Sequence, residues 1–240
     1  MIQVFLNSRD ASLQINQNTS DVIFHLPRID LPTKQITELT VGVKSAEIPT
    51  SFYNVDNINQ LLVYEINSGG IQQFTIPQGN YNVSTLKTVL QNNTGLIFTY
   101  QSTTNTYTIT HANYEFTLYT TSTCFELLGL SEGQPYTSTD QTITSNTNIN
   151  LFPIRTLHIT SSNFITKNLS SNDTRNACYL CSIQNSVPPN SVIYYQGDLM
   201  SQVNSIENLV NTHLRLLDQR GRIVDLNGQH WSCTLVIRYK

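Results

Sequence analysis

The chain has 240 residues and a net charge of −3, and charged residues make up 12% of it, about half of the usual ~25%. A chain of this length buries roughly 70% of its unfolded surface, so its core needs neither disulfides nor metal ions. Lys and Arg form no cluster, which argues against binding of nucleic acid through its phosphates. Ser, Thr, Asn and Gln supply most of the polarity, and an interface can cover them without desolvating many charges. This composition suits an interface protein or a secreted β protein.

Three short strands are expected at the beginning of the chain. They cover residues 2–7, 22–26 and 37–48. In the third, Leu39, Val41 and Val43 alternate with Thr, Gly and Lys, which is the period of a strand with one buried face. Pro49 ends this strand because proline cannot donate a hydrogen bond to a neighbouring strand.

Residues 53–135 combine strand-like and helix-like sequence patterns, and we expect them to fold as a small inserted α+β domain. The segment Asn67–Gly70 joins two apolar runs and is a hairpin signal. A helix is expected to begin at Asn82 or Ser84, with an apolar stripe that includes Leu86 and Leu90. The other expected elements are strands at 61–66, 71–77, 97–101 and 106–120, the last interrupted near Ala112-Asn113, and a short helix at 122–130 that ends near Gly129. Residues 131–150 are polar and rich in turn-forming residues, so we interpret them as a linker or an extended surface arm.

Strand-like segments return after residue 150. They cover residues 156–160, 178–183, 191–196, 210–217 and 232–239. With the three early strands they make eight, which predicts a fold dominated by β-structure, a single eight-stranded jelly-roll β-sandwich. Its domain is expected to be discontinuous, at residues 1–52 and 136–240, because a loop tip tolerates an inserted domain. The segment 214–240 is interpreted as the last hairpin, with Trp231, the only Trp, anchoring its base.

The sequence contains little that points to catalysis or metal binding. The five histidines, among them His25 and His158, never stand two or four residues apart, as a metal site on a β-sandwich would require. The segment Asp225–Gly228 resembles the start of a calcium loop but lacks the downstream Glu, so a turn is expected. A β-sandwich hydrolase with facing carboxylates stays open, and its candidate acids are Glu38, Glu47 and Asp56. We predict that the protein is not an enzyme and has no catalytic residue, no cofactor and no metal ligand.

Four cysteines occur, and only Cys178 and Cys181 lie close in sequence. This pair lacks the second pair of ligands that a zinc site needs. The cysteines are therefore expected to be small core residues in a reducing compartment. The N-terminal sequence has no apolar signal-peptide region, and no apolar stretch approaches the roughly 18 residues of a membrane span. We expect no membrane span.

Three sequence stretches are distinctive when taken together: VGVKSAEIPTSFYNV at 41–55, FTIPQGNYNVSTLKTVLQ at 74–91 and LLDQRGRIVDLNGQHWSCTLVIRY at 216–239. They resemble those of small capsid proteins of large DNA viruses and their virophages. Their order and approximate spacing also fit that family. The resemblance implies a penton or minor capsid protein with a single jelly roll, found in the virion and made in the host cytoplasm. Five copies would form a homopentamer that closes an icosahedral vertex and contacts the larger, double-jelly-roll major capsid protein. The residues themselves fit a trimer equally well.

A second function class stays open at this point. A carbohydrate- or receptor-binding β-sandwich, such as a spike or fibre head, would need an exposed aromatic platform. Candidate residues for such a platform are Tyr136, Tyr194 and Tyr195. Other minor capsid proteins, or a host glycan bound by the inserted domain, are further candidate partners, and no specific nucleic acid is expected.

Overall fold

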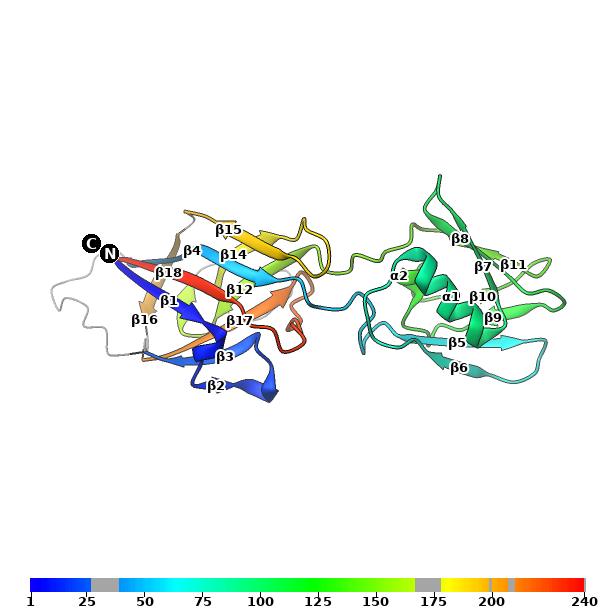
Figure 1. The fold of residues 1–240 in the computed structure, drawn as a ribbon, viewed down its shortest axis with the longest axis horizontal. Helices are drawn as coiled ribbons and strands as arrows, with labels where there is room; N and C mark the ends of the chain where they lie inside the picture. Colours follow the sequence, from blue (N-terminus) through cyan, green and yellow to red (C-terminus); the bar gives the residue numbers. More distant parts are fainter. Residues whose placement is uncertain (27–38, 167–177, 199, 207–209, 240) are drawn as a thin grey trace. The chain divides into compact units, whose positions relative to one another are not determined.

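The computed structural model describes residues 1–26, 39–166, 178–198, 200–206 and 210–239 (Figure 1). Glu38 and the start of the strand expected at 37–48 lie outside these residues. The chain divides into two compact units. The first unit comprises Met1–Phe52 and Ile154–Lys240, and the second unit comprises Tyr53–Pro153.

The eight strands predicted for the β-sandwich are all present in the first unit. They are β1 (Ile2–Asn7), β3 (Asp21–His25), β4 (Leu39–Pro49), β12 (Thr156–Ser161), β14 (Cys178–Gln184), β15 (Val192–Gln196), β17 (Asn211–Asp218) and β18 (Ser232–Tyr239). They pair in a nested, antiparallel order: β1 with β18, β3 with β17, β4 with β15, and β12 with β14. Further pairing of β18 with β4 and of β17 with β12 joins these pairs into two sheets. This is the topology of a jelly roll, so the expected fold class is confirmed.

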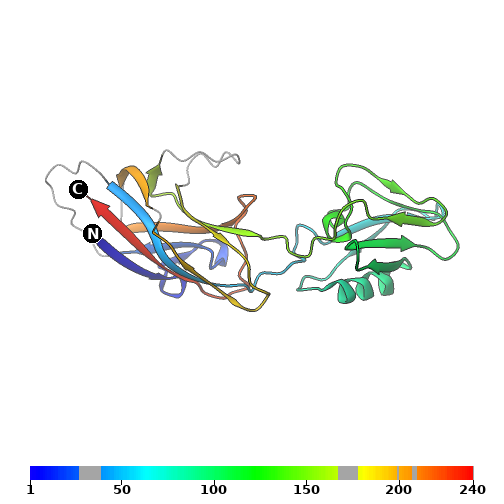
Figure 2. The same cartoon turned by 90° about the horizontal axis from the view of Figure 1, so that it is seen from above.

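Three short strands extend these sheets and were not predicted. They are β2 (Leu13–Gln14), β13 (Phe164–Thr166) and β16 (Ser201–Ile206). The first sheet has the order β1-β18-β4-β16-β13, with β15 also on β4, and the second has the order β14-β12-β17-β3-β2. In Figure 2, β1 in blue, β18 in red and β4 in light blue lie side by side, with both termini at the same end of the first unit. β16 was missed because its sequence is polar, and β2 was missed because it spans only two residues.

The core of the first unit lies between the two sheets. On β4, Val41 and Ile48 are fully buried and face this core, and on the opposite sheet Leu157 and Leu214 do the same. Neighbouring residues on each strand point outward because side chains alternate along a strand. The alternation read from the sequence therefore corresponds to the two inner faces of the sandwich.

The segment 214–240 is not a hairpin, which corrects the sequence interpretation. β17 belongs to the second sheet and β18 to the first, so the connection between them crosses from one sheet to the other. Trp231 stands at the end of this crossing, 3% exposed, within the core. Its indole N–H donates to the Thr19 carbonyl oxygen at 2.8 Å, and its backbone N–H donates to Ser8 Oγ at 3.0 Å. Trp231 thus holds the crossing against the beginning of the chain.

Hydrogen bonds and an ion pair hold the connection between β17 and β18 in its conformation. Asp218, 2% exposed, accepts hydrogen bonds from the backbone N–H groups of Arg220 and Arg222, at 2.8 and 2.9 Å. Its carboxylate also pairs with the Arg222 guanidinium at 2.7 Å. Gly221 has a φ of +78°, a conformation that costs other residues energy. Asn227 donates its amide N–H to the Ser51 carbonyl oxygen at 2.6 Å, so the third family-like stretch contacts the first.

The second unit contains the predicted ββαβββα elements and two further short strands. They are β5 (Leu61–Ile66), β6 (Gln72–Thr75), α1 (Val83–Thr94), β7 (Ile97–Gln101), β8 (Thr106–Thr110), β9 (Phe116–Leu118), α2 (Phe125–Leu128), β10 (Tyr136–Thr137) and β11 (Thr142–Thr144). The strands form two sheets, β10-β9-β5-β6 and β11-β8-β7, around a separate core. Asn82 caps α1: its side chain accepts from Thr85 N, and the Thr85 hydroxyl accepts from Asn82 N. Gly129 ends α2 with a φ of +68°, close enough to the Thr147 carbonyl oxygen that a Cβ would clash.

The interpretation of residues 131–150 as a linker or surface arm was wrong, and the second unit extends to Pro153 rather than to residue 135. β10 pairs with β9, and β11 pairs with β8. The Ser145 hydroxyl also accepts from Tyr107 N at 2.9 Å and donates to the Leu128 carbonyl oxygen at 2.6 Å. The polar side chains of this segment suggested a solvent-exposed loop. In the structure, its polar groups form hydrogen bonds within the second unit in place of hydrogen bonds to water.

Two of the family-like stretches meet at the base of the second unit. Asn54 Oδ1 accepts from Tyr81 N at 2.8 Å, and Asn54 Nδ2 donates to the carbonyl oxygens of Tyr81 and Leu151, at 2.7 and 3.2 Å. Asn80 Oδ1 in turn accepts from Asn54 N at 3.1 Å. One asparagine therefore ties the start of the unit to its end and to the segment before α1.

We predict that Trp231→Phe lowers the free energy of unfolding of the first unit by about 1–3 kcal/mol, because it leaves the buried Thr19 carbonyl oxygen without its donor. Urea titration followed by circular dichroism measures this change. The exposed-site control Leu13→Met, at a side chain that is 54% exposed, is expected to stay within about 0.5 kcal/mol of the parent chain. Equal stability of Trp231→Phe and the parent chain would contradict the anchoring role.

Candidate assembly surfaces

The outer face of the first sheet is polar at its centre and aromatic at its two edges. Residues that stand side by side across four strands are Phe5, Thr234, Ser45 and Gln196 in one row, and Asn7, Ser232, Glu47 and Tyr194 in the next. Within the first row, the Ser45 hydroxyl donates to Thr234 Oγ1 at 3.1 Å. Phe5 is 76% exposed and Tyr194 is 75% exposed. These two rings stand on β1 and β15, at opposite edges of the same sheet.

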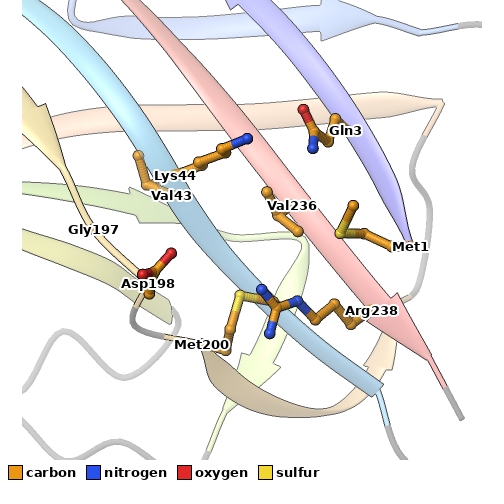
Figure 3. A pocket seen from close by; sticks show the side chains of 9 residues that line it. All are labelled: Met1, Gln3, Val43, Lys44, Gly197, Asp198, Met200, Val236 and Arg238. Atoms are coloured by element: carbon orange, nitrogen blue, oxygen red, sulfur yellow. The ribbon is translucent and has the colours of Figure 1, made fainter.

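A groove of about 270 Å³ crosses one end of this outer face (Figure 3). Gln3 of β1 and the preceding Met1 lie on one side of it, and Asp198 and Met200, which follow β15, lie on the other. Arg238 extends across the groove toward Met200. With Lys44 also in the lining, the groove combines two cations and one carboxylate with apolar surface.

Charge is distributed unevenly over the strands of the first unit. The charged residues of these strands are Asp21, Lys44, Glu47, Arg215, Asp218 and Arg238. All stand on β3, β4, β17 or β18, which pair with other strands on both sides. The strands at the sheet edges, β1, β2, β13, β14 and β15, contain no Asp, Glu, Lys, Arg or Pro. A contact made by these edges therefore desolvates no charged side chain of the strands themselves.

Three histidines on the outer face of the second sheet contact residues that are far from them in sequence. His25 Nδ1 lies 2.9 Å from Asn211 Oδ1, and His158 Nδ1 lies 2.8 Å from Ser182 Oγ. His213 contacts two residues from other segments: its Nε2 is 2.5 Å from Asp21 Oδ1 and its Nδ1 is 3.0 Å from Ser162 Oγ. Sequence spacing gave no sign of these contacts because the partners stand on different strands.

The chain of contacts from Ser162 through His213 to Asp21 contains the residue types of a serine hydrolase. In such enzymes the imidazole Nε2 faces the serine and Nδ1 faces the aspartate, whereas here the two nitrogens are exchanged. The three residues also stand on an outer sheet face rather than on the lining of the groove in Figure 3. We therefore assign them a structural role, which is to join β3 and β17 to the turn after β12.

The candidate residues for other functions are not brought together. Tyr194 points outward, but Tyr195 packs against the core of the first unit, and burial raises its pKa. Tyr136 belongs to the second unit, where its ring meets Phe125 edge to face and its hydroxyl accepts from Ser131 N at 2.9 Å. Tyr194 and Tyr195 therefore point to opposite sides of β15 and do not share the aromatic platform that a glycan-binding module would need.

Among the expected acids, Asp56 has a local role, and so has the calcium-like segment. Asp56 Oδ1 accepts from Ile58 N at 2.8 Å within a turn of the second unit, whereas Glu47 lies on β4 of the first unit. Asp225 Oδ1 accepts from Asn227 N at 2.8 Å, and Gly228 has a φ of +75°, as expected of a turn. Among the described residues, no group of three His, Cys, Asp or Glu side chains could hold a metal ion. In the same part of the chain, no helix is long and apolar enough to cross a membrane.

Comparison with known proteins rests on structure. No protein-family model matches the chain, and no curated protein matches it in sequence. The crystal structure of the mavirus penton protein, however, matches over 100% of both chains, with a TM-score of 0.52 and 11% sequence identity. This chain has the fold of a penton protein. A chain of the Sputnik virophage, solved by electron cryo-microscopy, matches over 98% of this chain and 97% of its own length, with a TM-score of 0.42 and 15% identity.

At 11% identity, the likeness to the mavirus penton protein is one of fold. It covers the inserted second unit as well as the jelly roll, because both chains match over their whole length. The family resemblance seen in the three sequence stretches is confirmed at this level. In this fold the three stretches have structural roles: they form the sheet crossing and the contacts of Asn54 at the start of the second unit.

Three cysteines, Cys124, Cys181 and Cys233, are buried as free thiols. Burial raises the pKa of Cys124 and of Cys181 to about 12 and raises that of Cys233 as well. We predict that none of the three reacts with Ellman's reagent in the folded chain and that all three react after unfolding in guanidinium, because the thiolate is the reactive form. The test uses a Cys178→Ser background, and rapid labelling of the folded protein would contradict it.

Acid is expected to destabilise the first unit partly through His158. Burial lowers the pKa of His158 below its ordinary value of 6.5, and the charge of Asp218 opposes this effect. The unfolded chain therefore binds the proton more readily, so the contribution of His158 to stability is complete above about pH 6.5 and is lost as the pH falls through the lower folded-state value. Denaturation midpoints of the parent chain and His158→Gln, measured at several pH values, should converge on acidification. Parallel curves would exclude this contribution.

Proposed function

We propose that this chain is a viral capsid protein of the penton type. Copies of it assemble into a homopentamer that closes an icosahedral vertex of the virion and contacts the major capsid protein. The proposal assigns the chain a structural role and no catalytic one, and places its synthesis in the host cytoplasm. The observation that carries it is the match to the mavirus penton protein over the full length of both chains.

The surface of the first unit supports this proposal on physical grounds. Subunits of a ring make heterologous contacts, in which two different patches of each chain meet. Such obligate interfaces bury on the order of 2,000 Å² or more, and each buried charge without a partner raises their cost. The edge strands of the jelly roll carry no charge, and β1 and β15 present exposed aromatic rings. Both features favour contacts along the flanks of the sandwich.

Assembly state tests the proposal directly. We expect purified chain, alone or with the major capsid protein, to form closed rings of five in mass photometry and in electron micrographs. In a map of the virus particle, the chain should occupy the fivefold vertices. A chain that stays monomeric both alone and with the major capsid protein, or that closes as a trimer, would contradict the proposal. Contact with other minor capsid proteins, or of the second unit with a host glycan, stays a prediction.

A further inference from the structure

Two edge strands of the first unit lack the features that keep sheet edges from pairing with other chains. Proteins protect such edges by making them short, by bulges, or with charged residues and Pro. Here β2 and β13 have 2 and 3 residues, and a register shift interrupts the pairing of β14 with β12. In contrast, β1 has 6 residues and β15 has 5, both pair without a register shift, and neither carries a charge or Pro.

Both strands have one free side within the described part of the chain. There, β1 pairs with β18 alone and β15 pairs with β4 alone. Each free side presents backbone N–H and C=O groups that only another strand can match along its length. The most exposed aromatic rings of the sheet, Phe5 and Tyr194, stand on these two strands.

The geometry of the sheet relates the two edges in a definite way. β1, β18, β4 and β15 follow one another in antiparallel order, so β1 and β15 run in opposite directions. Phe5 and Tyr194 point to the same face of the sheet, because the rows of paired residues place them both with Ser45 and Glu47 on the outer side. A second copy placed beside the first would therefore continue the antiparallel order. If the rows continue in register, Phe5 of one copy faces Gln196 of the other and Asn7 faces Tyr194, so Phe5 and Tyr194 become diagonal neighbours, a separation that aromatic side chains can bridge.

We propose that β1 of one copy lies along β15 of the next copy, with Phe5 packed beside Tyr194, and that this head-to-tail contact joins the subunits of the ring. The inference rests on the proposed assembly into rings and names the surfaces that meet. Every chain supplies one strand of each kind, so the contact repeats from copy to copy until rotation closes it. A second copy is the matching occupant because the two strands are similar in length, opposite in direction and equally free of charge.

The first test introduces a charge at each edge. Phe5→Lys and Tyr194→Lys should each weaken ring assembly at least tenfold in sedimentation or mass photometry, because each places an ammonium group in the contact. Ile71→Lys is the matched control: Ile71 is 63% exposed and lies in the second unit, and this variant should assemble as the parent does. Circular dichroism establishes that each variant is folded. Full assembly of both edge variants would overturn the inference.

The second test uses cross-linking and stays informative even if the lysine variants fold poorly. In a Cys178→Ser background, a short bis-maleimide should link Phe5→Cys chains to Tyr194→Cys chains when the two are mixed. The double variant should give a ladder of linked species that ends at the closed ring, and each single variant alone should give no linked pairs above the background-only chain. Linked pairs in either single variant alone would indicate a twofold contact and overturn the head-to-tail arrangement.

The two proposals fail in distinguishable ways. If the parent chain forms no rings, alone or with the major capsid protein, the proposed function fails and this contact fails with it. If the parent forms rings but the lysine variants assemble normally and the double-cysteine variant gives no ladder, the ring stands and only the β1–β15 contact is refuted.

Discussion

The pairing of the first strand with the last is the constraint on which the first unit depends. β1 and β18 match residue for residue from Ile2 opposite Ile237 to Asn7 opposite Ser232, and the remaining strands are nested inside this pair. The nesting places β18 and β4 side by side in one sheet and β17 and β12 in the other. The hydrophobic faces of these four strands then bury one another, which is the main favourable contribution to the stability of such a sandwich.

The same arrangement explains where polar and charged groups are found. The charged residues on the strands of the first unit all stand on strands with two neighbours, where the backbone is paired on both sides. His213 and Asp21 illustrate this, since they join β17 and β3 across the outer face of the second sheet. The edge strands carry no charged residue. A surface of this kind is suited to contact with copies of itself.

Much of the fold could be predicted because alternation is a local property. Strands such as β1, β7 and β18 have the bounds that the apolar pattern indicates, and Pro49 ends β4 as expected. The sheet crossing between β17 and β18 was missed because Asn227-Gly228 signals a turn without indicating which sheet follows it. β16 was missed because its sequence, SQVNSI, is polar and gains strand structure only by pairing with β4 and β13. Contacts such as His213 with Asp21 join residues 192 positions apart, and no spacing rule reaches that far.

The nested pairing also bears on how the protein is made. All residues of the second unit have been synthesised once Pro153 is joined, so it can fold while the rest of the chain is still on the ribosome. The jelly roll has to wait, because β1 and β4 acquire their shared neighbour only when residues 232–239 have emerged. A nascent chain therefore cannot complete its first sheet, and with it the edge strand β1, before β18 has left the ribosome.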